Sequence, residues 1–94
     1  MYLPLYNGVK SLQIGVPKGS RFDFVRPSVE KPVVIYGTSI AQGACASRPG
    51  MGWTNILQRK LEMPFVYLGF SGNGQMDEGF FKLLAEVDAA MYVI

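Results

Sequence analysis

The sequence has 94 residues, of which 49% are hydrophobic and 17% charged, and its formal net charge is +2 at pH 7. This length fits one domain, and the hydrophobic content excludes a disordered chain. The basic residues are too scattered for a nucleic-acid surface, and no apolar stretch approaches the roughly 20 residues that span a bilayer. We therefore expect neither nucleic acid nor membrane as a partner.

Two residue counts limit the chemistry. The chain has no histidine, which is the usual base beside a serine nucleophile, and one cysteine, Cys45. Cys45 cannot form an internal disulfide and has no partners at metal-ligand spacing. We expect Cys45 to be a small, half-buried residue, and we expect no metal and no cofactor.

The first 30 residues predict short strands. Extended or alternating patterns cover residues 2–6, 9–16 and 22–25. The pair Asn7-Gly8 is a hairpin signal, and residues 17–20 are a second break. Residues 26–32 combine two prolines with three charges, as linkers do. We interpret residues 1–30 as the end of a β-rich accessory domain plus its linker.

Residues 31–94 follow the order strand, helix, strand, helix, strand. The predicted strands are the apolar runs 33–36, 65–68 and 89–94. One predicted helix covers residues 50–62 and places Trp53 on an apolar stripe that we expect in the core, and Asp77 opens the other. This alternation predicts an α/β fold with a parallel sheet and helices on both of its faces.

The third predicted strand coincides with the last residues, 89–94. A parallel sheet that stops there would leave an apolar edge uncovered. We therefore expect that both ends are cut from something longer, and that copies of the chain self-associate through this edge.

Two loops follow the carboxyl ends of predicted strands, residues 37–43 with Ser39 and the glycine-rich residues 69–74. Ligands bind at this end of open parallel sheets, and the common strand order 2-1-3 would make the loops neighbours. A serine hydroxyl facing glycine amides suits acyl transfer, because fixed donors stabilise the developing oxyanion. We expect a cavity open to solvent around the Ser39 hydroxyl.

Other interpretations of these residues remain open. Ser39 fits a helix N-cap or a turn, and Asn73 fits a left-handed turn residue. The glycines of residues 69–74 fit an amide nest for an anion or a nucleotide. Neither loop matches a dinucleotide or phosphate-loop fingerprint, and Ala41 breaks the G-x-S-x-G pattern of the α/β-hydrolase elbow.

The two loops resemble the SGNH hydrolase family, also called GDSL-type esterases. The segment I-Y-G-T-S-I resembles its first block, with Thr38 where aspartate is usual, and L-G-F-S-G-N-G resembles its second block. The resemblance implies a flavodoxin-like, three-layer sheet of which this chain is a part. It also implies that Ser39 is the nucleophile, that the amides of Ser39 and Gly72 bind the oxyanion, and that Thr38 and Asn73 support substrate or oxyanion.

The resemblance further implies hydrolysis of short acyl esters, including acetyl groups on carbohydrates, without a cofactor. The family's third-block asparagine and its catalytic aspartate and histidine have no match in this chain. We therefore expect the first half of an esterase domain, in residues 31–94, that is inactive by itself. Relatives with a β-rich domain are typically exported, which implies a periplasmic or extracellular location. The alternative is a non-catalytic α/β binding module in which Ser39 is a turn residue.

Overall fold

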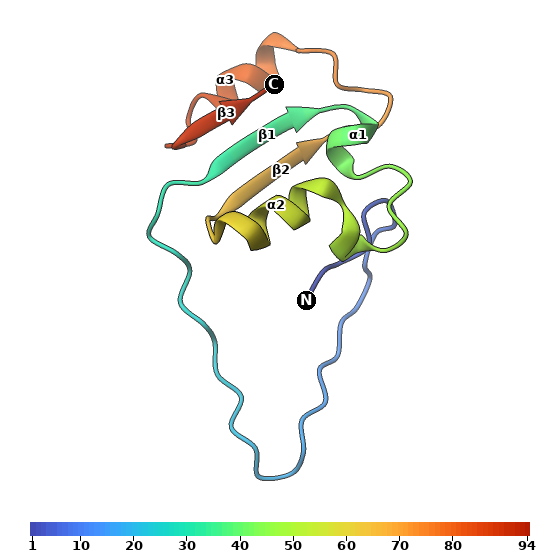
Figure 1. Ribbon diagram of the computed structural model, residues 1–94, viewed down its shortest axis with the longest axis vertical. Coiled ribbons are helices and arrows are strands. Elements are labelled where there is room, and N and C mark those ends of the chain that lie inside the picture. Colours follow the sequence, from blue (N-terminus) through green and yellow to red (C-terminus); the bar gives the residue numbers. More distant parts are fainter.

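A parallel sheet of three strands lies at the centre of the computed structural model, which describes residues 1–94 (Figure 1). The strands are β1 (Val33–Gly37), β2 (Phe65–Gly69) and β3 (Met91–Val93). Their order is β2-β1-β3, and both pairings are parallel. The predicted α/β class and the strand order 2-1-3 are confirmed.

Three α-helices and one 3-10 turn connect the strands. They are α1 (Ser39–Gln42), η1 (Pro49–Met51), α2 (Trp53–Leu61) and α3 (Glu78–Leu84). The helix predicted for residues 50–62 is therefore α2 with η1 before it, and Asp77 is the N-cap residue of α3, as predicted. None of the helices is long and apolar enough to cross a bilayer.

The central strand β1 is covered on both faces, which explains its continuously apolar sequence. Val33 and Ile35 belong to a buried cluster on one face, together with Ala41 of α1. On the other face the ring of Tyr36 lies 5.1 Å from that of Phe80, in α3. Because α2 and α3 lie on opposite sides of the sheet, the unit has the three layers of a partial flavodoxin-like fold (Figure 1).

The apolar stripe of α2 is more exposed than the sequence predicts. Trp53 is 39% exposed, and its indole N–H donates to the carbonyl of Ile40 at 2.8 Å. With Leu57 and Leu61 it lines an apolar groove of about 280 Å³ that runs to Met91 of β3. The prediction of a core Trp53 is wrong because no other element packs on the outer side of this stripe.

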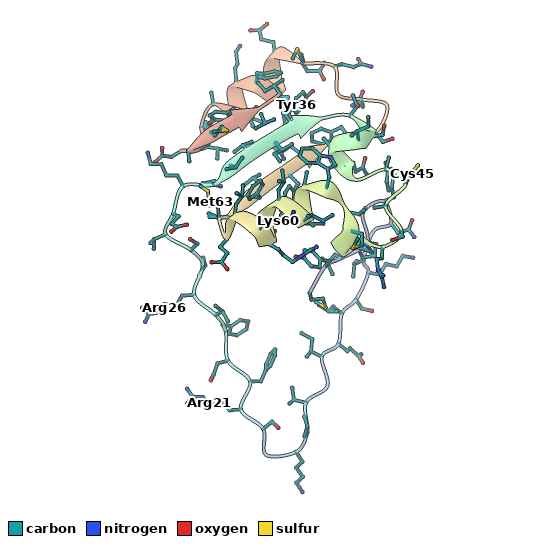
Figure 2. The ribbon with its side chains drawn as sticks, in the orientation of Figure 1. Arg21, Arg26, Tyr36, Cys45, Lys60 and Met63 are labelled. Atoms are coloured by element: carbon teal, nitrogen blue, oxygen red, sulfur yellow. The ribbon has the colours of Figure 1, made fainter.

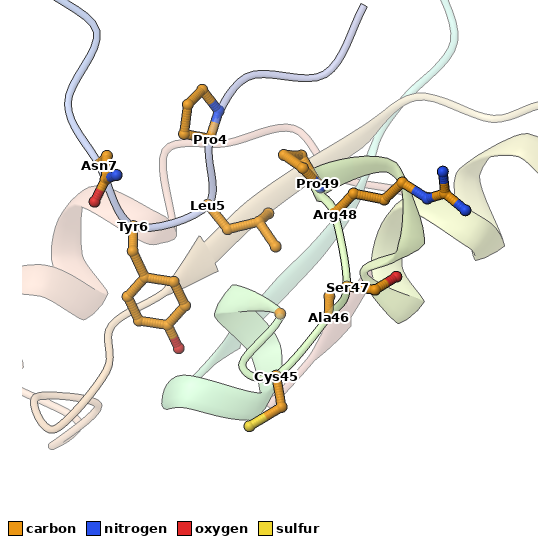
Figure 3. A pocket seen from close by; sticks show the side chains of 10 residues that line it. Pro4, Leu5, Tyr6, Asn7, Cys45, Ala46, Ser47, Arg48 and Pro49 are labelled. Carbon is orange, nitrogen blue, oxygen red and sulfur yellow. The ribbon is translucent and has the colours of Figure 1, made fainter.

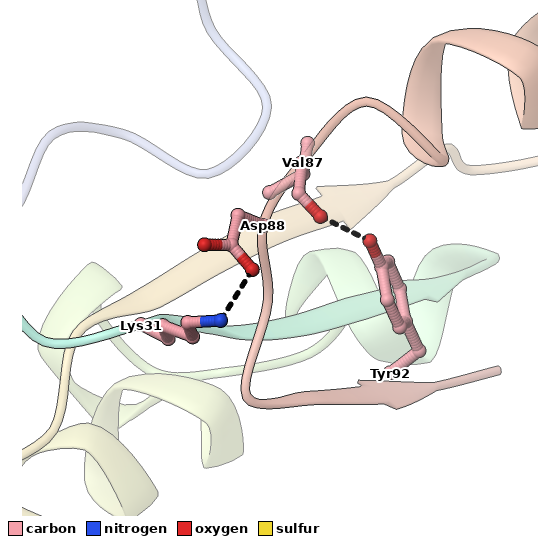
Figure 4. Close-up of polar contacts among 4 residues, drawn as sticks. All are labelled: Lys31, Val87, Asp88 and Tyr92. Carbon is pink, nitrogen blue, oxygen red and sulfur yellow. Dashed lines mark hydrogen bonds and ion pairs between the residues drawn. The ribbon is translucent and has the colours of Figure 1, made fainter.

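Strand β3 is tied to the turn before it (Figure 4). The Tyr92 hydroxyl donates to the carbonyls of Val87 and, at 3.2 Å, of Leu84. The Lys31 ammonium lies 2.6 Å from an Asp88 carboxylate oxygen and so links this turn to the start of β1. Residues 91–94 are exposed, and β3 pairs only with β1. Self-association through its outer edge stays a prediction.

Residues 1–32 contain no strand or helix, so the strands predicted at residues 2–6, 9–16 and 22–25 are wrong. The chain runs outward and back as one wide loop, with Arg21 and Arg26 far from the α/β unit (Figures 1 and 2). Strand backbone needs a hydrogen-bonding neighbour, and the two arms of this loop are too far apart to pair.

One local feature of this loop is confirmed. The break at residues 17–20 is a turn, in which the Ser20 N–H donates to the Pro17 carbonyl at 3.0 Å and Gly19 has a φ of 87°. A left-handed residue at this third turn position favours glycine. Whether residues 1–30 end a β-rich accessory domain stays a prediction.

Candidate active site

Ser39 is the first residue of α1 and lies just beyond the carboxyl end of β1. Thr38, and not Ser39, is the N-cap residue, and its side chain makes no capping hydrogen bond. The Ser39 hydroxyl forms no hydrogen bond within the chain, and the residue is half-buried. The N-cap interpretation of Ser39 therefore does not apply, and its hydroxyl is free to meet another molecule.

The glycine-rich loop after β2 forms a tight turn. The Asn73 N–H donates to the Phe70 carbonyl at 3.0 Å, and Gly72 occupies the third position with a φ of 74°. The left-handed residue of this turn is therefore Gly72, and the prediction of a left-handed Asn73 is wrong. Gly72 has no Cβ to clash at this φ, which is why glycine suits the position. No hydrogen bond within the chain engages the Gly72 amide.

The two loops lie side by side. The Phe70 N–H donates to the Gly37 carbonyl at 2.8 Å, across the ends of β1 and β2. A Cβ on Gly74 would lie only 2.8 Å from the Thr38 methyl carbon. The predicted convergence of the loops is therefore confirmed, because adjacent parallel strands release their following loops at one edge of the sheet. The catalytic roles assigned to these residues stay predictions.

Two strand-end glycines let α1 approach the sheet closely. A Cβ on Gly69 would lie 2.2 Å from the backbone nitrogen of Gln42, and a Cβ on Gly37 would lie 2.9 Å from the Cβ of Ala41. Neither glycine has a left-handed φ, so close packing is what requires them. This packing role was not predicted from the sequence, although a glycine directly after each of two apolar runs is its signal.

The start of the N-terminal segment forms a wall beside α1. The Tyr6 hydroxyl donates to the Ser39 carbonyl at 3.4 Å, and the Gln42 side-chain amide donates to the Leu5 carbonyl at 3.0 Å. A pocket of about 280 Å³ separates residues 4–7 from the loop after α1 (Figure 3). Cys45 lines this pocket and is exposed with a φ of 61°, so its predicted half-buried position is wrong.

The site around Ser39 is an open surface. None of the four main pockets is lined by Ser39 or Gly72. Thr38, Gly72 and Asn73 are all exposed. The expected cavity around the Ser39 hydroxyl is therefore not among these pockets, because the two loops meet at the exposed rim of the sheet.

Charge contributes little at this rim. The clearly perturbed side chain is Tyr67 on β2, where burial raises the pKa of the hydroxyl to about 12. The Tyr67 hydroxyl lies 2.7 Å from the Gln58 side-chain oxygen and 3.2 Å from the Thr54 carbonyl, under α2 and away from Ser39. No group of three or more His, Cys, Asp or Glu side chains is placed to hold a metal ion.

Comparison with known proteins gives two matches. Residues 30–94 match the model of the GDSL-like Lipase/Acylhydrolase family. A crystal structure of a protein from Bacteroides ovatus ATCC 8483, named a GDSL-like lipase, has a TM-score of 0.88 and 43% sequence identity to this chain. The match covers 97% of this chain and 27% of that chain, so this sequence spans about a quarter of that protein. Comparison with curated proteins gave no match.

Proposed function

The chain belongs to the GDSL-like lipase/acylhydrolase family, and we propose that it carries the nucleophile half of a serine esterase site. The observation that carries this proposal is the meeting of the Ser39 loop with the glycine-rich turn, where the Phe70 N–H bonds the Gly37 carbonyl at 2.8 Å. Acyl transfer needs a nucleophile beside amide donors that are already fixed in place.

In the proposed reaction, the Ser39 hydroxyl oxygen attacks the ester carbonyl carbon while a base takes its proton. The carbonyl oxygen becomes an oxyanion that accepts hydrogen bonds from the amides of Ser39 and Gly72. The tetrahedral intermediate then expels the alcohol, and water releases the acyl group from Ser39. Thr38 and Asn73 flank these groups and would support the oxyanion or contact substrate.

Two observations support the assignment of the oxyanion donors. The Gly72 amide has no partner within the chain. Ser39 is the first residue of α1, where the backbone N–H has no acceptor inside the helix. Both amides are therefore available to a substrate oxygen.

The base lies outside these residues, because the chain contains no histidine. We therefore propose that the isolated chain does not turn over esters. The proposed substrates are short acyl esters, such as acetylated carbohydrates.

A fluorophosphonate probe tests the nucleophile. The Ser39 oxygen would form a bond to phosphorus as fluoride leaves, and the proton would pass to buffer. The chain has no histidine to take the Ser39 proton, but the Ser39 and Gly72 amides would still be available to bind the phosphoryl oxygen. We therefore expect slow labelling, located at Ser39 by peptide mass spectrometry, that Ser39→Ala abolishes.

The matched control is Ser71→Ala, because the Ser71 hydroxyl has no proposed role and its backbone amide is unchanged. This variant should label like the wild type. Labelling that is spread over several serines, or that persists in Ser39→Ala, would contradict the proposal. Steady hydrolysis of p-nitrophenyl acetate that depends on Ser39 would show instead that the isolated chain is active.

A second candidate is a non-catalytic α/β binding module, in which Ser39 is only the first helical residue. The observation that favours it is that the chain contains no histidine to act as the base for Ser39. This candidate predicts equal, non-selective reaction of the exposed serines with the probe, so the same labelling experiment separates the two functions.

A further inference from the structure

Gln42 joins three segments that are far apart in the sequence. It is the last residue of α1 and is half-buried. Its side-chain nitrogen donates to the Leu5 carbonyl at 3.0 Å, and its side-chain oxygen accepts from the Ser71 N–H at 2.8 Å. The first partner can only accept and the second can only donate, so these bonds fix which way the amide group faces.

The backbone of Gln42 is held as firmly as its side chain. The Gln42 N–H donates to the Thr38 carbonyl at 3.1 Å, and the missing Cβ of Gly69 leaves room for the Gln42 backbone against the end of β2. The side chain therefore starts from a fixed point against Gly69, the first residue of the glycine-rich loop. From there its amide reaches both the turn and the N-terminal segment.

The turn after β2 presents three successive amides, of which two have partners within the chain. The Phe70 N–H bonds the Gly37 carbonyl at 2.8 Å, and the Ser71 N–H bonds the Gln42 side chain at 2.8 Å. The next amide, that of Gly72, has no partner in the chain. The first two bonds tie the turn to the loop and helix that carry Ser39, and the third amide is left for a ligand.

We propose that Gln42 is a positioning residue, which holds the Ser71–Gly72 peptide so that the Gly72 amide keeps one orientation relative to Ser39. This inference rests on the proposed function, in which the orientation of the Gly72 amide matters because that amide binds the oxyanion. The orientation itself is measurable without any ester. Gln42 does not touch substrate in this account and acts through the turn.

Two variants separate the two bonds of Gln42. Gln42→Met has a similar length and loses both bonds. Gln42→Glu keeps an acceptor for the Ser71 N–H but loses the donor to Leu5. If Gln42 positions the turn, Gln42→Glu should restore the protection of the Ser71 amide and the orientation of the Gly72 amide that Gln42→Met loses.

The experiment is NMR of the ¹⁵N-labelled chain, using amide hydrogen exchange and residual dipolar couplings. In Gln42→Met we expect the Ser71 amide to exchange roughly five- to tenfold faster, the loss of about one hydrogen bond. The Gly72 N–H coupling should fall as the peptide reorients. Amides of β1 and β2 should exchange at the wild-type rate. Gln42→Glu should restore both the Ser71 and the Gly72 values.

Unchanged values at Ser71 and Gly72 in Gln42→Met would overturn the proposal. So would an equal loss of protection throughout β1 and β2, since Gln42 would then be a general structural residue. If Gln42→Met does not fold, Gln42→Glu decides alone, because loss of Ser71 protection in that variant contradicts the proposal and retention supports it.

A functional measurement completes the test. Where wild-type Ser39 labels with the fluorophosphonate, the rate should fall about tenfold in Gln42→Met and recover in Gln42→Glu. Absence of labelling in the wild type, with the NMR differences present, would contradict the esterase function and leave the positioning of the turn intact. The two failures are thus distinguishable.

Discussion

The central strand and the N-terminal segment contain similar residue types and have opposite environments. Val34 in β1 is 1% exposed, whereas Val29 is 100% exposed and Phe24 is 99% exposed. Strand β1 has a parallel partner on each side and a helix over each face. The N-terminal segment, residues 1–32, has no strand and no ladder partner. Burial of apolar side chains is therefore favourable, but it occurs only where neighbouring elements pack against them.

The N-terminal segment is nevertheless anchored at its start. The Arg59 guanidinium donates to the Tyr2 hydroxyl at 2.9 Å and lies 5.3 Å from the centre of its ring. Leu5 and Tyr6 bond to α1 through the contacts described above. After these contacts the chain leaves the α/β unit and returns to it at Lys31, which pairs with Asp88. The two regions therefore meet at residues 2–6, beside α1 and α2, and again at residues 31–32.

The largest expected difference between the regions is in proteolysis. Lys18 and Arg21 lie on exposed backbone without ladder hydrogen bonds, whereas Arg59 and Lys60 lie in α2. Exposed segments open at almost no free-energy cost, while helices of a packed unit must unfold first. We expect trypsin to cut after Lys18 and Arg21 roughly 100-fold faster than in α2. A mass-spectrometric time course measures both rates, and early cuts in α2 would contradict the comparison.

The second-largest expected difference is in the free energy of unfolding when one glycine of each region is replaced by alanine. A Cβ at Gly69 would meet the Gln42 backbone nitrogen at 2.2 Å, whereas one at Gly15 would meet nothing within 4 Å. We expect Gly69→Ala to lower the free energy of unfolding by about 3 kcal/mol or to prevent folding, as overpacked sites do. Gly15→Ala should change it by less than about 0.5 kcal/mol. Urea unfolding followed by circular dichroism measures both; a tolerated Gly69→Ala would show that α1 does not press on β2.

The smallest expected effect concerns the contact between the regions at high pH. The pKa of Tyr67 is raised to about 12, mainly by burial and also by the nearby Tyr2, while Arg59 opposes the rise. An unfolded tyrosine has a pKa near 10. Between about pH 10 and 12 the unfolded chain therefore loses this proton first, so stability falls as pH rises.

The variant Tyr67→Phe should remove part of this alkaline loss, because phenylalanine has no proton to release. Unfolding curves at pH 8, 10 and 11 for both proteins measure the difference, which should appear only above about pH 10. Tyr2→Phe should weaken the effect as well. The same pH dependence in Tyr67→Phe and the wild type would contradict the raised pKa of Tyr67. The same pH dependence in Tyr2→Phe and the wild type would mean that Tyr2 does not lie near Tyr67 in solution.

The residue patterns alone predict most of the α/β unit. Apolar runs of strand length, a helical stripe and Pro64 place β1, α2 and β2 within a few residues of their observed bounds. The parallel arrangement follows from the alternation of strands and helices. The position of Ser39 at the carboxyl end of β1 follows from the same pattern, because a glycine ends the apolar run two residues earlier.

Other features depend on residues that are distant in the sequence. The alternating residues 9–16 satisfy strand propensity but have no partner, and the stripe of α2 leaves Trp53 exposed because nothing covers it. The bonds of Gln42 to Leu5 and Ser71 link positions 37 and 29 residues apart. A local pattern records which face of an element favours burial. Only the folded chain determines what lies against that face, because those contacts join segments whose separation no local pattern encodes.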